Sequence, residues 1–189
     1  EYRVSGQGTL PTERAVYRYH YKGLRSNVAG YGVQGFQSVT VHDVNSGISD
    51  ISSYAVSFPF TGMLKSSERR RNDGSLLQAI YNDLGVSTPS CGHAPIGVFP
   101  YIEKSKNIDY EIGMGGTFVV KSADTQYSYD SCGSVTQVSV ATYRGSNPWD
   151  DRHFVTTFNT YVNDLSLWHL GRLLSSEVVH QSPDGGVQT

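Results

Sequence analysis

Apolar and polar residues alternate with a period of two along most of the chain, which is the pattern of β-strands. Residues 12–23 show it most clearly, with opposite faces carrying Ala15, Tyr17, Tyr19 and Tyr21 on one side and Val16, Arg18 and His20 on the other. Similar β-branched and aromatic runs predict further strands at 36–44, 48–58, 62–71, 98–104, 108–112, 117–129, 135–143, 153–162 and 170–180.

Turn-forming residues separate these runs at intervals of roughly eight to fifteen residues, and helical periodicity is nearly absent. Asn45-Ser46-Gly47 and Asn72-Asp73-Gly74 predict hairpin turns, because Asn and Gly tolerate the positive φ that tight hairpins need. Gly113-Met114-Gly115-Gly116 also predicts a turn. The Gly motifs do not open helices, so a turn is favoured over a phosphate-binding loop.

Residues 75–83 fit two structures. Leu76, Ile80 and Leu84 are four apart, with Asp73 and Gly85 as potential caps, which is compatible with a short helix. The hairpin turn before this segment favours a strand instead.

We therefore predict an all-β fold of antiparallel hairpins that form a twisted sheet. The prediction treats residues 1–189 as a single module with a loop insertion at 86–97 and a flexible tail at 181–189. Several strands carry Thr, Ser and Tyr on both faces, which suits a large sheet or the edge of a bigger assembly better than a compact sandwich.

Composition narrows the function classes. The chain has 189 residues with 13 Tyr, 38% hydrophobic residues and a formal net charge of -2, which gives no electrostatic case for binding nucleic acid or an anionic membrane. No run approaches the ~20 apolar residues of a membrane-spanning helix. The N-terminus lacks the pattern of a signal peptide, so we expect any targeting information to lie outside this chain.

Two cysteines, Cys91 and Cys132, are too few for a disulfide scaffold or a four-cysteine zinc site. The sequence leaves open whether they form one bridge. Cys91 and His93, with Asp130 or Asp109 as an orienting group, are candidates for a hydrolase site. Adjacent loop residues rarely present that geometry, so we favour a surface loop or a disulfide.

One motif combines an aromatic strand end with a turn: Tyr129-Asp130, followed by Gly133. Asp130 is placed to cap amides of the turn, and Gly133 supplies backbone freedom before the next strand. Similar alternations of aromatic and polar residues occur at 17–23 and 157–164. We interpret the motif as a device that builds a sheet and does no chemistry.

The Tyr129-Asp130 motif resembles the YD repeat of Rhs and teneurin-type proteins. Residues 21–25, 30–36, 43–47 and 58–63 resemble the block that precedes the repeats in bacterial insecticidal Tc-toxin B components and related virulence-plasmid toxin proteins. Residues 99–101, 159–161 and 168–173 resemble its continuation, so the resemblance spans roughly 15–180. The chain departs from the pattern in the loop with Cys91 and in Ser131-Cys132 within the turn.

The resemblance implies a section of the β-sheet wall of a hollow shell that encloses a toxic segment. It implies a secreted or cell-surface bacterial protein whose partners are other segments of the shell or partner toxin subunits. The self-cleavage motif of that family, Asp-Pro-x-Gly, does not occur in this sequence. We accordingly expect a structural module that is not an enzyme and needs no cofactor.

Other candidate residues have simpler interpretations. The histidines lack zinc-binding spacing, and Asp150-Asp151 fits an exposed turn better than a calcium site. Residues 68–71, Glu-Arg-Arg-Arg, suggest a solvated edge that discourages strand addition. An alternative function, binding a glycan or a host surface protein, would use an aromatic face of Tyr31, Trp149 and Trp168.

A wall section separated from its neighbours has unpaired edge strands. We therefore expect these edges to be buried by oligomerisation, or closed locally by the loop at 86–97.

Overall fold

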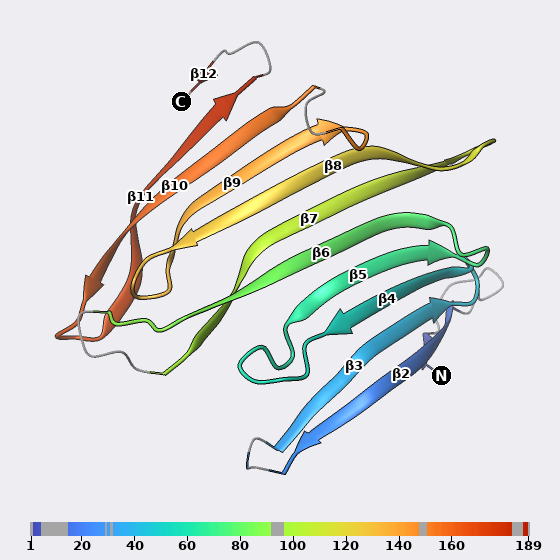
Figure 1. Ribbon diagram of the computed structural model, residues 1–189, viewed down its shortest axis with the longest axis horizontal. Helices are drawn as coiled ribbons and strands as arrows, with labels where there is room; N and C mark the ends of the chain where they lie inside the picture. Colours follow the sequence, from blue (N-terminus) through green and yellow to red (C-terminus); the bar gives the residue numbers. More distant parts are fainter. Residues whose placement is uncertain are drawn as a thin grey trace, which may run out of the picture. The chain divides into compact units, whose positions relative to one another are not determined.

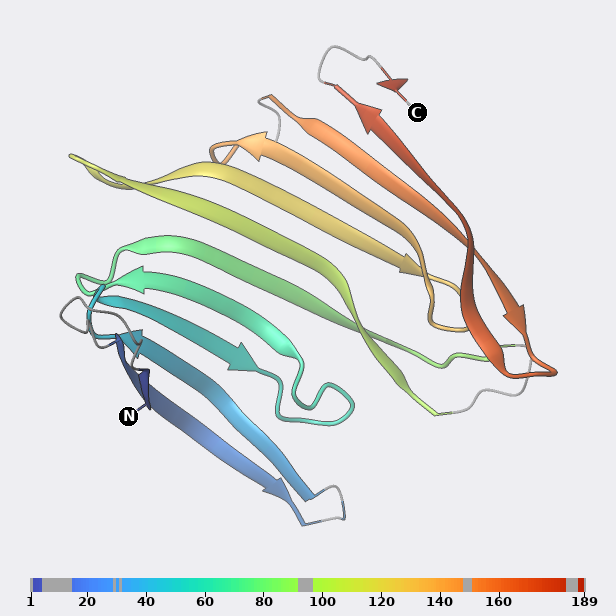
Figure 2. The same cartoon turned by 180° about the vertical axis from the view of Figure 1, so that it is seen from behind.

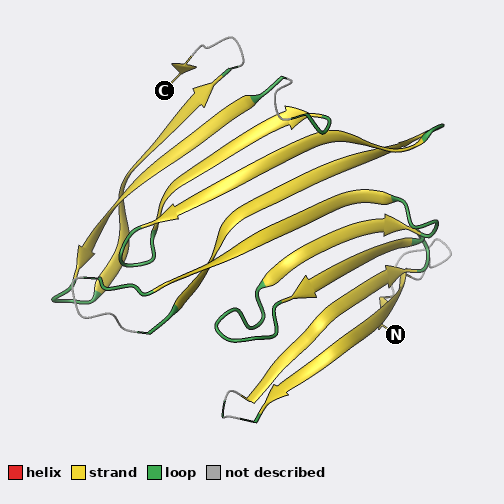
Figure 3. Cartoon of the chain, viewed as in Figure 1, coloured by secondary structure: helices red, strands yellow, loops and turns green. Residues whose placement is uncertain are grey.

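The computed structural model describes residues 2–4, 15–28, 30, 32–91, 97–147, 151–182 and 187–188. These residues form β-strands and turns without a helix (Figure 3). Strand order in the sheet follows chain order, and each pair whose register is known is antiparallel. The predicted fold class, an all-β arrangement of antiparallel hairpins, is confirmed.

By their contacts the residues group into two compact units. The first comprises residues 1–81 and 110–118, and the second comprises 82–109 and 119–189. The boundary between the units runs through three long strands.

The first unit consists of a meander of strands (Figure 1). Its members are β1 (Tyr2–Val4), β2 (Ala15–Asn27), β3 (Gly32–Asp43), β4 (Ile48–Tyr54), β5 (Leu64–Arg71) and the first half of β6 (Leu76–Ser87). The segment with two interpretations, 75–83, is a strand, in which Ala79 lies opposite Glu68 of β5. The cross-strand register and the preceding turn outweigh the four-residue spacing of its leucines.

The second unit continues the same pattern (Figure 2). It contains most of β7 (Phe99–Gly113) and of β8 (Gly116–Tyr129), and all of β9 (Val135–Arg144), β10 (His153–Asp164), β11 (His169–Gln181) and β12 (Val187–Gln188). The two strands predicted at 98–104 and 108–112 are one strand, β7. The polar Lys106 lies between the two predicted segments, where it is 3.5 Å from Asp124 on the adjacent β8, and the strand continues through it without a turn.

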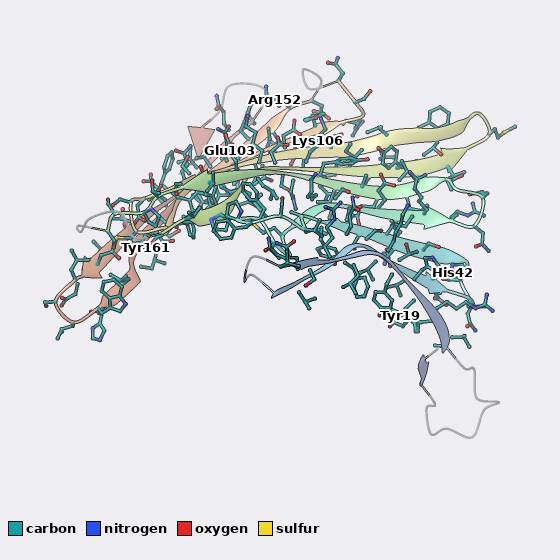
Figure 4. All side chains as sticks on the ribbon, turned by 60° about the horizontal axis from the view of Figure 1, so that its bottom comes forward. Tyr19, His42, Glu103, Lys106, Arg152 and Tyr161 are labelled. Carbon is teal, nitrogen blue, oxygen red and sulfur yellow. A yellow bond between two sulfur atoms is a disulfide. The ribbon has the colours of Figure 1, made fainter. Side chains whose placement is uncertain are left out.

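Neither unit has a conventional apolar core. Among the described residues, the buried side chains are Ala55 and Ala79 in the first unit and Ser122, Ala141 and Tyr143 in the second. Side chains project from the strands on both faces (Figure 4). A sheet normally buries one face against another layer, and the described residues supply no such layer for these strands.

Candidate functional site

The turn between β8 and β9 is built around Asp130. One carboxylate oxygen of Asp130 accepts hydrogen bonds from the amides of Cys132 and Ser134, both at 2.8 Å. Gly133 has φ 87°, which an L side chain rarely adopts. The Tyr129 hydroxyl donates to the carbonyl of Ile102 on β7 at 2.9 Å. The motif residues thus fix a hairpin and attach it to a neighbouring strand.

The same aspartate device recurs at other hairpins, where the sequence analysis did not predict that an aspartate accepts the turn amides. Asp43, Asp73 and Asp164 each accept a hydrogen bond at 2.9 Å from the amide two residues further on. These hydrogen bonds, including side-chain bonds from Ser46 to Asp43 and from Ser166 to Asp164, lower the pKa of the three carboxyls below the usual value. Each of these Asp residues lies within two residues of the end of a predicted strand, which was the signal for the capped turn.

A disulfide joins Cys91 to Cys132, with 4.4 Å between the Cα atoms. The amides of Ser90 and Cys91 both donate to the Ser131 carbonyl at 3.1 Å, so the two segments are also joined through the main chain. This link ties the segment after β6 to the β8–β9 turn. The described part of the predicted loop therefore closes neither edge strand.

Aromatic rings pack beside this turn. Tyr129 lies 4.7 Å from Tyr101 and 5.9 Å from Phe99, measured between ring centroids. A Cβ added at Gly133 would lie 3.2 Å from the Phe99 ring, and one added at Gly85 would lie 2.6 Å from Tyr101. A side chain at Gly85 would therefore force the Tyr101 ring to move, and one at Gly133 would crowd the Phe99 ring. Burial of Tyr129 raises the pKa of its hydroxyl.

A polar cluster fastens the centre of the second unit. The buried Tyr143 hydroxyl donates to Asp124 at 3.0 Å and accepts from the Lys106 ammonium at 3.0 Å. Lys106 also lies 3.5 Å from the Asp124 carboxylate. The hydrogen bond to Tyr143, followed by the charge of Asp124, raises the pKa of Lys106. The cluster connects β7, β8 and β9 without placing a reactive group in a cleft.

The outer strands are paired over only part of their length. β1 covers Ala15 to Tyr17 of β2, and β12 covers His180 and Gln181 of β11. In the described part of the chain, no strand pairs with the outer edge of residues 18–26 of β2 or of residues 169–179 of β11. Both strands expose large apolar side chains, namely Tyr19, Tyr21 and Leu24 on β2 and Leu173, Leu174 and Val178 on β11.

The proposed aromatic face is described only at Trp168. Its side chain is 62% exposed in the turn between β10 and β11 and has φ 55°. Tyr31 and Trp149 lie outside the described residues. The structure therefore does not place the three rings together.

The other candidate residues form no reactive site within the described residues. Cys91 is bound in the disulfide and His93 lies outside the described part of the chain. The arginines at 69 and 70 lie on β5, which pairs with β4 on one side and β6 on the other, so the prediction of an edge at 68–71 is wrong. Arg69 instead makes a bidentate pair with Asp50 at 2.8 and 3.1 Å, and Arg70 contacts Glu68 at 2.7 Å.

Two further features bear on chemistry. Within the described ranges, no group of three or more His, Cys, Asp or Glu side chains could hold a metal ion. An open depression of about 480 Å³ in the second unit is lined by Val120, Lys121, Thr142, Tyr143, Arg144, Asp151 and His153. Arg144 and Asp151 of this depression are 3.8 Å apart and largely exposed, so the depression lacks the enclosed, converging polar groups of a catalytic site.

A search of the described residues for a helix long and apolar enough to cross a membrane found none.

The fold is that of a part of known toxin-complex structures. The chain matches the crystal structure of TcdB2-TccC3 with a TM-score of 0.68, and that of TcdB2-TccC3-Cdc42 with a TM-score of 0.69. In both cases the match covers 90% of this chain and 12% of the other, at 10% sequence identity. The chain also matches the crystal structure of TcdB2-TccC3 without its hypervariable C-terminal region, with a TM-score of 0.68 and the same coverage of both chains.

No family model and no curated protein sequence matches the chain. At 10% identity, the similarity to the TcdB2-TccC3 structures shows the fold alone. The chain spans about an eighth of the length of the structures it matches.

Proposed function

We propose that the chain is a structural β-sheet wall or scaffold segment of a toxin assembly of the Rhs/YD-repeat and Tc-toxin B class. In this role it encloses or presents a toxin, and it is not itself catalytic. Its partners are other segments of the shell or partner toxin subunits. The assembly is secreted or displayed at the bacterial cell surface, where an oxidising environment would maintain the Cys91–Cys132 disulfide.

The observation that carries this proposal is that, among the described residues, each unit buries few side chains and the outer strands β2 and β11 are paired over only part of their outer edges. Each unit buries at most three side chains among its described residues, although a stable domain needs a packed apolar interior. Among the described residues, no strand pairs with most of the outer edge of β2 or of β11, and such edges attract further strands. Both features are expected of a segment that is completed by neighbouring strands and layers.

The similarity to the TcdB2-TccC3 structures supports the same assignment at the level of fold. It extends over nearly the whole of this chain but over a small part of those structures, as expected for one section of a larger wall. The engagement of Cys91 in a disulfide removes the thiolate that the hydrolase alternative needs.

Light scattering coupled to size-exclusion chromatography tests the edge component of the proposal. We expect the isolated chain to associate with increasing concentration, and the double variant Leu173→Lys/Leu174→Lys to associate less, because charges on an edge strand oppose strand addition. The matched control is Val28→Lys/Met114→Lys, which replaces exposed apolar residues in turns. Equal association of both variants, or a wild-type chain that stays monomeric at high concentration, would contradict the proposal.

A second candidate function is binding to a glycan or a host surface protein. Leu167 and Trp168 favour it, because both are more than 60% exposed at the tip of the β10–β11 hairpin. Asp164 accepts amide hydrogen bonds from Ser166 and Leu167, which holds this tip in one conformation. Retention of the wild type on a glycan array or host-cell surface, and its loss in Trp168→Ala, would support this function over the scaffold role.

A further inference from the structure

The exposed edge of β2 differs sharply between its two faces. Arg18, His20 and Lys22 project to one face of the strand, and Tyr19 and Tyr21 project to the other, because neighbouring side chains in a strand point in opposite directions. All five side chains are exposed. The edge therefore presents a basic stripe on one side and an aromatic stripe on the other.

The basic stripe is not neutralised within its own sheet. The β3 residues directly opposite Arg18, His20 and Lys22 are His42, Thr40 and Ser38, none of which is acidic. Figure 4 shows His42, whose ring nitrogen Nδ1 lies 2.9 Å from the Ser49 hydroxyl. In the part of the chain that the structure describes, no carboxylate pairs with Arg18 or Lys22.

The carboxylates on the neighbouring strands are already engaged. Glu68 lies on β5, three strands from β2 and on the basic face, where it binds Arg70 and the Tyr81 hydroxyl. Asp50 lies on the aromatic face and binds Arg69. These two carboxylates of β4 and β5 therefore do not complement the basic stripe of β2.

The aromatic stripe is equally incomplete. Tyr19 is 45% exposed and Tyr21 is 52% exposed, with near-parallel rings whose centroids are 6.4 Å apart. The Phe36 ring lies 4.9 Å from Tyr21 and supports it from β3. Figure 4 shows Tyr19 on this strand. Aromatic rings gain stability from ring partners beyond the gain from area burial, and the exposed Tyr19 and Tyr21 have room for such a partner.

The pairing of β1 shows how a partner strand would lie. Tyr2 stands opposite Tyr17 and Val4 opposite Ala15, so the outer edge of β2 accepts an antiparallel strand in this register. The same edge continues past Tyr17 through Arg18 to Lys22, where main-chain groups have no partner among the described residues. An added strand that extends this pairing would place its side chains alternately against the basic and aromatic stripes.

We propose that β2 is completed by an antiparallel strand with alternating acidic and apolar residues. The acidic residues face Arg18, His20 and Lys22, and the apolar residues face Tyr19 and Tyr21. This inference rests on the proposed function, because it specifies which neighbouring segment of the assembly the wall accepts. Basic residues on the edge repel strands of like charge, and the exposed tyrosines favour a strand that covers them, so the edge is selective.

Short synthetic peptides added to the full 189-residue chain test the proposal. One peptide alternates glutamate and valine, a second alternates lysine and valine, and a third contains the glutamates and valines of the first in two blocks. We expect the glutamate–valine alternation to bind about tenfold more tightly than either other peptide, because cross-strand charge pairs and apolar pairs both contribute. It should slow hydrogen exchange of the amides between Arg18 and Lys22.

Charge reversal provides the decisive arm. Arg18→Glu/Lys22→Glu should reverse the preference in favour of the lysine–valine peptide, whereas the control Lys65→Glu/Lys121→Glu has the same net charge change on other exposed strand positions and should retain the wild-type preference. If all three peptides slowed hydrogen exchange of β2 equally, the proposed charge complementarity would be wrong, but the proposed wall function would be unaffected. Absence of β2 protection with every peptide would overturn the docking site, whereas association of the chain through its edges tests the wall function separately.

Discussion

The two units use the same antiparallel hairpins and aspartate-capped turns but are fastened differently. In the first unit, the side-chain interactions are exposed. Asp50 pairs with Arg69, and the Tyr81 hydroxyl donates a hydrogen bond of 3.2 Å to Glu68, although the Tyr81 side chain is 40% exposed. The second adds a disulfide and the buried Tyr143. When a sheet has few buried side chains, its stability depends on disulfides and on hydrogen bonds between strands. A disulfide stabilises more than an exposed ion pair does, so we expect the second unit to be the more stable in isolation.

Removal of the disulfide should have the largest effect. Cys91→Ser/Cys132→Ser opens a loop of sequence separation 41, which should lower the free energy of unfolding of the second unit by about 4 kcal/mol through the entropy of the unfolded chain. Hydrogen exchange resolved by strand can measure this loss. β9 and β10 should exchange faster while β3 and β4 are unchanged, and equal acceleration in both units would break the comparison.

Removal of one buried hydroxyl should have the next largest effect. Tyr143→Phe removes the group that bridges Lys106 and Asp124, and should cost about 2–3 kcal/mol because the hydroxyl is buried and bonded to charged groups. The matched variant in the first unit, Tyr81→Phe, removes an exposed hydroxyl and should cost less than about 1 kcal/mol. Denaturant unfolding of both variants measures the difference, and equal losses would contradict the account.

The turn aspartates should show a smaller difference in the same direction. Asp130→Ala removes two amide hydrogen bonds at 2.8 Å in a partly buried turn and should cost about 1–2 kcal/mol. Asp43→Ala removes the corresponding bonds of an exposed turn, and water can replace them, so its effect should be smaller. Thermal unfolding of the two variants would contradict this ranking if Asp43→Ala were the more damaging.

The smallest expected effect is acid destabilisation. Asp43, Asp73 and Asp164 have folded-state pKa values below the unfolded value of 3.8, so the unfolded chain takes up these protons at higher pH than the folded chain. Their stabilisation is present above about pH 4 and is lost as the pH falls through the folded-state pKa values.

Two of these three turns belong to the first unit, so acid should loosen β3–β4 and β5–β6 before the β10–β11 hairpin. Hydrogen exchange at pH 5 and pH 3 measures this order. Asp43→Asn/Asp73→Asn should make the first unit less sensitive to acid, and an unchanged pH dependence would exclude the two carboxyls as its cause.

Much of the fold follows from local patterns because the strand period and the turn residues act at short range. The alternation around Tyr19 and the Asn-containing turns placed most strands within a few residues. Local patterns could not show that residues 98–112 form one strand, because Lys106 is accommodated by Tyr143, which is distant in sequence. They also misplaced residues 68–71, since whether a strand is an edge depends on its neighbours.

The residues of the candidate site were harder to predict, because their contacts also join segments that are distant in the sequence. The pairing of Cys91 with Cys132 depends on the approach of two turns, which neither local sequence encodes. The two-sided character of β2 can be seen in the alternation of Arg18 to Lys22, but its meaning depends on the outer edge lacking a partner there. The sequence pattern of β2 shows which side chains lie on each face of the strand. The sheet topology shows which edge of the strand has no paired neighbour.

The most direct test of the central claim is a cryo-EM structure of this chain within the assembly that it forms in its native source. The account predicts that further strands pair along the outer edges of β2 beyond Tyr17 and of β11 before His180, and that additional protein covers at least one face of each unit. An assembly in which both edges face solvent along these stretches would contradict the claim that the chain is a wall segment.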